Sequence, residues 1–192
     1  MNHNKNSSED KNYYLTEWDK QCMAYHEAGH AVCHHFLSNR KILKITISPN
    51  DEAFGMMQIA PNQNHNETAK YLKNSIAVLL AGELVEKYYL GEKTTSIYSD
   101  LQIATQIASD MVTKYNMGKK VQLISKEIYS EKLMFWVEKD IISILKEAEV
   151  IAKKIVMENK QLIEKLANLL LQQLTLTQVD LEMFFDKWDG LC

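Results

Sequence analysis

The segment His26-Glu27-Ala28-Gly29-His30 carries two histidines four residues apart, with a glutamate directly after the first, in the pattern H-E-x-x-H. Residues at this spacing share one face of a helix, so both imidazoles can bind the same cation. Glu27 points roughly 100° away around the helix axis, which places it beside the metal and outside its coordination sphere. A zinc ion in such a site lowers the pKa of a bound water and polarises a carbonyl, while the glutamate accepts the proton. The motif therefore predicts metal-assisted peptide hydrolysis, with Glu27 as general base and His26 and His30 as ligands.

Two histidines do not complete a metal site, so a third ligand must come from elsewhere in the chain. His34 continues the i, i+4 series, but three such residues span about 12 Å along a helix, too far for one zinc ion. His34 and His35 are therefore interpreted as flanking residues. The carboxylate candidates are Glu52, Glu83, Glu86 and Asp100. Asp100 stands where a helix is expected to begin, and local sequence alone favours an N-cap role for it. Sequence spacing does not decide which of the four carboxylates is the third ligand.

The elements that must position these residues are mostly helical. Apolar spacing predicts helices over about 17–37, 68–91 and 99–116, and again from about 137 to 174. A break near Glu158-Asn159 divides the last segment into two antiparallel helices, and a short helix over 179–188 follows. Alternating segments at 42–48 and 54–59 predict a hairpin. The expected fold is mainly α (α+β), with a small β-hairpin or sheet and a C-terminal antiparallel helix pair.

A chain of 192 residues is most simply one compact unit. The polar stretch over residues 1–14 predicts a disordered tail, and we expect a single domain over 15–188. Within that domain, residues 15–118 hold the metal-site part and residues 135–188 the C-terminal helical part.

Composition excludes several classes of protein. Lys and Arg total 22 against 25 Asp and Glu, with Arg40 as the one arginine, and this near-neutral balance argues against nucleic-acid binding. The six glycines form no phosphate-binding loop. No apolar run approaches the roughly 18 residues of a membrane span. The N-terminus lacks the apolar core of a signal peptide, and the three cysteines have no metal-ligand spacing, so we expect free thiols in a cytoplasmic protein.

The segment from about 17 to 185 resembles the peptidase domain of the FtsH family of AAA proteases, and the matching blocks occur in the family's order. The blocks are A-Y-H-E-A-G-H-A-V at 24–32, I-T-I-S-P at 45–49 with F-G at 54–55, A-G-E-L-V-E at 81–86, G-E-K-T-T at 91–95 with S-D-L at 99–101, and M-V-T-K-Y-N-M at 111–117.

This resemblance implies that the metal is zinc and that Asp100 is the third ligand. It also implies that Glu86 lies nearby and orients a ligand histidine, with Glu86 as a direct ligand in the alternative. The sequence departs from the family at four positions, which we expect to alter the rim and the oligomer contacts more than the metal. These are Glu83 for arginine, Ser96 and Asn116 for glycine, and Ser99 for asparagine. The family's membrane span and ATPase module are missing from this sequence.

We therefore expect a zinc metalloendopeptidase that cuts unfolded or flexible polypeptides without an ATPase of its own. The alternative is a catalytically silent binding or regulatory module that docks a partner, although a pure scaffold has no need of Glu27. The apolar stripe of the C-terminal helices is expected to pack the core. Self-assembly or docking of a separate ATPase is the alternative role for that stripe.

Overall fold

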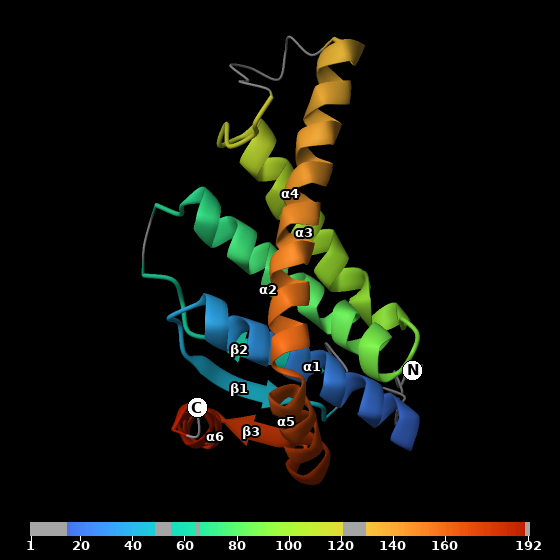
Figure 1. The fold of residues 1–192 in the computed structure, drawn as a ribbon, viewed down its shortest axis with the longest axis vertical. Coiled ribbons are helices and arrows are strands. Elements are labelled where there is room, and N and C mark those ends of the chain that lie inside the picture. Colours follow the sequence, from blue (N-terminus) through green and yellow to red (C-terminus); the bar gives the residue numbers. More distant parts are fainter. Residues whose placement is uncertain (1–14, 49–54, 64–65, 121–129, 191–192) are drawn as a thin grey trace, which may run out of the picture.

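The computed structural model describes residues 15–48, 55–63, 66–120 and 130–190 (Figure 1). The elements in these ranges are α1 (Glu17–Leu37), β1 (Ile42–Thr46), β2 (Met56–Ile59), α2 (Ala69–Tyr89), the 3-10 turn η1 (Thr95–Ile97), α3 (Tyr98–Thr113), α4 (Glu131–Glu158), α5 (Lys160–Gln173), β3 (Thr175–Thr177) and α6 (Gln178–Asp189). The predicted mainly helical class with one small sheet is confirmed. The tail predicted over 1–14 lies outside the described residues. None of the helices in these ranges combines the length and apolar character that crossing a membrane requires.

Helix α1 is the central element of the fold. Its N-cap is Thr16, where a capping box joins the side chains and backbone N–H groups of Thr16 and Asp19. Every residue from Cys22 to His34 is buried, because α1 packs against α2, α4, α5 and the sheet. This close packing fixes the position of the H-E-x-x-H segment.

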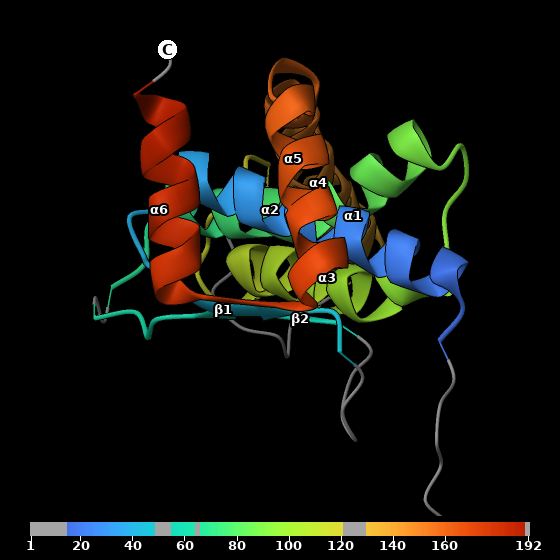
Figure 2. The same cartoon turned by 90° about the horizontal axis from the view of Figure 1, so that it is seen from below.

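The sheet has the strand order β2-β1-β3, and both pairings are antiparallel. The predicted hairpin corresponds to β1 and β2, whereas β3 was not predicted. β3 brings the segment after α5 beside β1, so that Leu176 faces Ile45 and both are fully buried. All three strands lie on one side of the helices (Figure 2). β2 is an edge strand, and its outer side pairs with no other strand in the described ranges.

The expected antiparallel pairing of the C-terminal helices is wrong, although the break between them is where the sequence predicts it. Only Asn159 separates α4 from α5. Its N–H donates to the Ile155 carbonyl and its carbonyl accepts from the Ile163 N–H, each at 3.0 Å, so both helices are hydrogen-bonded up to this residue. One residue leaves no room for a reversal. The chain bends instead, and α5 packs against α1 rather than returning along α4 (Figures 1 and 2).

Candidate metal centre

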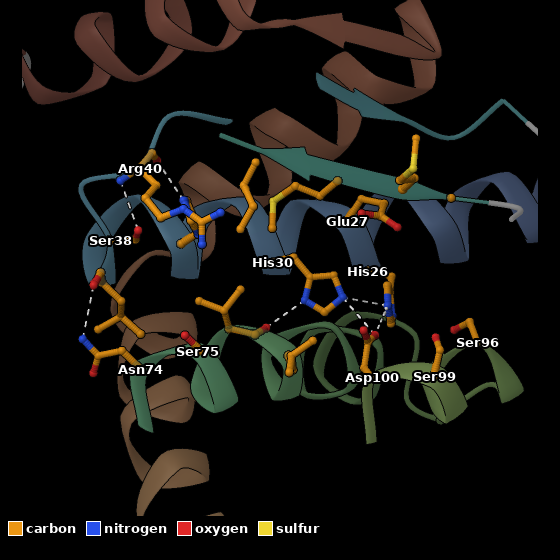
Figure 3. A pocket seen from close by; sticks show the side chains of 18 of the residues that line it. His26, Glu27, His30, Ser38, Arg40, Asn74, Ser75, Ser96, Ser99 and Asp100 are labelled. Atoms are coloured by element: carbon orange, nitrogen blue, oxygen red, sulfur yellow. Dashed lines mark hydrogen bonds and ion pairs between the residues drawn. The ribbon is translucent and has the colours of Figure 1, made fainter. Parts of the chain in front are cut away.

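Three side chains from two helices meet at one point in the structure. The Nε2 atoms of His26 and His30, both on α1, lie 2.9 Å apart. Asp100 from the first turn of α3 places its Oδ2 at 3.0 Å from the Nε2 of His26 and 3.1 Å from that of His30 (Figure 3). Among the described residues, these three form the group of metal-ligating side chains that could hold an ion. Of the three candidate carboxylates that the structure describes, Glu83, Glu86 and Asp100, it is Asp100 that contacts the Nε2 atoms of both histidines.

The start of α3 explains how Asp100 reaches this position. The turn η1 precedes the helix, which begins at Tyr98, so the N-cap is Ile97 and it makes no side-chain capping bond. The N-cap role that local sequence favours for Asp100 is thus wrong. Its carboxylate lies in the first helical turn, where the helix dipole favours negative charge, and it points toward α1.

A second carboxylate holds the other side of the His26 ring. The Nδ1 of His26 lies 2.7 Å from Oε1 of Glu86, a fully buried residue on α2. Glu86 accepts two further hydrogen bonds, from the backbone N–H of Thr94 at 2.8 Å and from the hydroxyl of Ser96 at 2.7 Å. Because Glu86 contacts the opposite nitrogen of the ring, it lies outside the three-atom group. We interpret it as a residue that positions His26 and fixes its tautomer.

The hydrogen bonds of the two imidazole rings leave both Nε2 lone pairs facing the Asp100 carboxylate, an arrangement that favours a bound cation. The Nδ1 of His30 lies 2.7 Å from the carbonyl of Val78, an acceptor only, so this nitrogen carries a proton and Nε2 presents its lone pair. The same assignment holds for neutral His26, whose Nδ1 donates to Glu86. Two lone pairs and a carboxylate then face one another. The triangle that they form is slightly tighter than the roughly 3.4 Å separation of ligands around a tetrahedral zinc ion, so the donor set fits zinc.

The charges in this group reinforce one another. Burial alone would lower the pKa of His26, but its hydrogen bonds to Asp100 and Glu86 raise that pKa to about 9. Burial alone would raise the pKa of Asp100, yet the two histidines hold it well below its usual value. The pKa of Glu86 is lowered as well, because its hydrogen bonds outweigh its burial. The site thus favours two carboxylates around one positive charge, whether that charge is a proton or a metal ion.

Glu27 has a different environment from the other two acids. It is buried, and within the described part of the chain its Oε2 has no hydrogen-bond partner. Burial raises its pKa above the ordinary glutamate value, and the histidines oppose this only in part. Gly55 lies so close that a Cβ there would approach Oε1 of Glu27 to 2.8 Å. An orphaned buried carboxylate oxygen indicates a group that waits for a partner from the adjoining space.

That space is a cavity of about 630 Å³ that runs between α1 and β2 on one side and α2 and α3 on the other (Figure 3). The three candidate ligands and Glu27 line it, together with residues 56, 57 and 59 of the edge strand. The cavity is therefore lined by a candidate metal centre, by the buried carboxylate of Glu27 and by a strand whose outer side is unpaired within the described ranges.

The remaining candidates from the sequence lie elsewhere. Glu83 forms an ion pair with Lys93. His34 donates to the backbone carbonyl of Arg40 at 2.8 Å, and the ring of His35 stacks on Phe185, in agreement with flanking roles. Glu52 is not among the described residues. Sequence reasoning missed the Val78 carbonyl and the Thr94 N–H, because backbone groups leave no signal in residue types.

The departure at residue 96 has an unexpected consequence. It was expected to alter the rim of the site, yet the Ser96 hydroxyl donates directly to Glu86. The side chain at the position of the family glycine therefore helps to hold Glu86, which in turn contacts the candidate ligand His26.

A histidine pair on one helix, completed by a distant aspartate and flanked by a buried glutamate, defines a candidate metal-dependent hydrolase site. Residues 13–184 match Peptidase family M41, and the chain belongs to this family. It is 34% identical over 183 residues to the ATP-dependent zinc metalloprotease FtsH 2 of Thermoanaerobacter sp. (strain X514), a match that covers 95% of this chain and 36% of the relative.

Two further relatives also match most of this chain. The ATP-dependent zinc metalloprotease FtsH of Acidobacterium capsulatum is 30% identical over 199 residues, covering 95% of this chain and 31% of the relative. The mitochondrial ATP-dependent zinc metalloprotease FTSH 10 of Arabidopsis thaliana is 28% identical over 183 residues, a match that covers 90% of this chain and 22% of the relative. The resemblance to FtsH proteases is confirmed, and the chain spans about a third or less of the length of these relatives.

Proposed function

We propose that this chain is a zinc-dependent endopeptidase, with His26, His30 and Asp100 as the zinc ligands and Glu27 as the general base. The single observation that carries the proposal is the buried Oε2 of Glu27, which has no hydrogen-bond partner among the described residues and lies in the cavity that the three proposed ligands line. The zinc relatives and the family membership support the same reading.

In the proposed reaction, bound zinc supplies a Lewis acid that polarises the scissile carbonyl. Glu27 accepts a proton from the attacking water and delivers it to the leaving amine. The raised pKa of Glu27 suits both steps, because a carboxylate with a low pKa accepts a proton only weakly. Glu86 and the Val78 carbonyl keep the two imidazoles in the tautomer that presents Nε2 to the metal.

The substrate in this proposal is an extended polypeptide segment. The outer side of β2 borders the cavity, and an extended chain can pair with such an edge through backbone hydrogen bonds. A folded substrate has no free strand to offer, so we infer that substrates are unfolded or flexible. The relatives are named ATP-dependent, and delivery of substrate by an ATPase is compatible with the same site.

The alternative function is a silent module that binds a partner without cutting it. A purely structural metal site has no use for a buried carboxylate oxygen that, within the described ranges, has no hydrogen-bond partner, and burying such an oxygen is costly. Glu27 therefore favours the enzyme. The free, buried thiols of Cys22 and Cys33 support the proposed reducing, cytoplasmic setting.

The test uses the full chain loaded with one equivalent of zinc and incubated with an unfolded protein such as casein. We expect cleavage by the unaltered chain and a loss of roughly 10²–10⁴-fold in Glu27→Gln, with the zinc content unchanged. His30→Ala, which removes a ligand, should lose both zinc and activity. If Glu27→Gln and the unaltered chain behave identically toward every substrate, the enzyme proposal is wrong and the silent module stands.

A further inference from the structure

The end of the cavity away from the metal centre carries a positive charge. The cavity extends past His30 along α1 to Ser38, Arg40 and Asn74, and Figure 3 shows Arg40 on the far side of His30 from Asp100. Arg40 is the one Lys or Arg among the residues that line the cavity. The acidic lining residues, Glu27 and Asp100, belong to the metal end. The cavity therefore has acidic side chains at the end near the candidate metal centre and a basic side chain at the other end.

The partners of the Arg40 guanidinium among the described residues are neutral groups. Its Nε donates to the Ala60 carbonyl at 2.6 Å, its Nη2 donates to the same oxygen, and its Nη1 donates to the Tyr71 hydroxyl at 3.0 Å. None of the carboxylates in the described ranges lies within ion-pair distance of it. Three of the five guanidinium N–H groups are used, which leaves two for another acceptor.

A half-buried guanidinium without a counter-charge has a strong preference for an anionic partner. Charge-assisted hydrogen bonds from Arg to a carboxylate are about twice as strong as neutral ones, and the planar guanidinium matches the two oxygens of a carboxylate. The Ala60 and Tyr71 contacts preorient the group, so less side-chain freedom is lost when an acceptor arrives. The site is thus prepared for a carboxylate.

The length of the edge strand β2 gives the distance along the substrate between a carboxylate bound at Arg40 and the bond that is cut. Gly55, just before β2, approaches Glu27, and Ala60, just after β2, binds Arg40. A substrate strand along β2 advances by about 3.3 Å per residue, as β2 does. The substrate residue next to Arg40 is therefore roughly three to five residues from the one next to Glu27.

We propose that Arg40 is a specificity-determining residue that binds a carboxylate of the substrate, roughly three to five residues from the scissile bond. This inference rests on the proposed function for the identity of the ligand. The carboxylate is supplied by an Asp or Glu side chain or by the C-terminus of the polypeptide.

The test measures binding rather than cleavage, so that it does not depend on turnover. Zinc-loaded Glu27→Gln, as the full chain, is titrated with labelled peptides that differ only by Glu or Gln at each of these positions. A second pair has a free or an amidated C-terminus at the same spacing. We expect roughly tenfold tighter binding of the carboxylate member of at least one pair, and a smaller ratio at high salt. Preference in the first pair assigns the side chain, and preference in the second assigns the terminus.

Two variants separate recognition from packing. Arg40→Gln in the same background should bring the ratio to one while leaving the affinity for the neutral peptide nearly unchanged. Lys41→Gln removes the neighbouring positive charge, which pairs with Glu182 outside the cavity, and should leave the ratio unchanged. If Arg40→Gln does not fold, Arg40→Lys keeps the charge and should retain a reduced preference.

Equal affinity for both members of every pair overturns the inference, as does a preference that survives Arg40→Gln. Cleavage of the neutral peptide by the unaltered chain tests the proposed function separately. A carboxylate preference without any cleavage would uphold the Arg40 site and refute the peptidase. A chain that cleaves peptides without such a preference would do the reverse, and a chain that binds none of the peptides refutes both.

Discussion

The Nδ1 atom of His26 lies 2.7 Å from Oε1 of Glu86, although the two residues are 60 positions apart and on different helices. This contact ties α1 to α2 at the ring that must face the metal. Glu86 is in turn held by the segment that leads to Asp100, through Thr94 and Ser96. One buried carboxylate therefore links all three segments that build the metal centre.

Replacing Glu86 by Gln is expected to weaken zinc binding by about 10–100-fold without unfolding the chain, because the ring of His26 loses its anionic acceptor. Competition with a chromophoric chelator measures the affinity. Glu83→Gln, on the same helix but paired with Lys93 away from the cavity, is the matched control and should bind zinc normally. Equal affinities in the two variants would contradict the positioning role of Glu86.

Replacing Ser96 by Gly removes the hydroxyl that donates to Glu86, and we expect a loss of about 1 kcal/mol in the free energy of unfolding. The double variant with Glu86→Gln should lose less than the sum of the single losses, because the neutral amide oxygen that replaces the carboxylate accepts the Ser96 hydrogen bond more weakly. Denaturant titrations of the four proteins give the coupling. Strictly additive losses would show that the hydrogen bond does not matter.

Replacing Gly82 by Ala is expected to displace the His26 ring, because the added Cβ would lie 2.6–2.8 Å from three of its atoms. We predict loss of zinc binding together with a destabilisation of about 1–3 kcal/mol. Gly190→Ala is the control, since its Cβ would meet nothing closer than 3.4 Å. Zinc analysis and thermal unfolding check both variants, and normal zinc binding by Gly82→Ala would refute the tight fit.

The metal-free protein should become less stable as pH rises from about 6.5 to 9. The pKa of His26 is raised to about 9 in the folded state, above its ordinary value of 6.5, so its stabilising proton is fully present below 6.5 and lost through 9. The loss is on the order of 1–3 kcal/mol. Zinc-loaded protein should show the opposite trend in this range, because metal binding releases the proton. Urea titrations across this range test both trends, and a flat metal-free profile would contradict the first.

Removing the metal is expected to abolish cleavage while leaving the helices in place. The core around α1 is built from apolar side chains such as Ala24, Ala28 and Val32, which need no ion to pack. Dialysis against a chelator, followed by circular dichroism and re-addition of zinc, tests this. A chain that unfolds on chelation would indicate a structural metal site instead.

Much of the fold was accessible from residue patterns, but the proposed third ligand was not. The histidine spacing encodes a local geometry, so α1 and its ligand face could be predicted directly. Asp100 is separated from His26 and His30 by tertiary contacts, and no period or spacing connects them. The residues before it resemble a capping segment, and only the turn at Thr95–Ile97 shows that the helix begins earlier.

The two errors in the C-terminal part have separate causes. β3 comprises only Thr175–Thr177, too few residues for an alternating pattern to emerge, and its strand conformation depends on pairing with β1. The bend at Asn159 interrupts the apolar pattern just as a helical hairpin would. The chain forms a bend and not a hairpin because α5 packs its apolar residues, such as Leu162 and Leu166, against the apolar surface of α1.

The pairing of β3 with β1 also affects the order in which parts of the fold can form while the chain is being synthesised. Both histidines, Glu27 and Asp100 leave the ribosome well before Thr175–Thr177, which complete the sheet. During translation the candidate ligands can therefore meet while β1 still has one side exposed and β2 is less firmly anchored. We expect the strand edge proposed to bind substrate to form last, so that a nascent chain can bind the proposed zinc ion before it can bind a polypeptide.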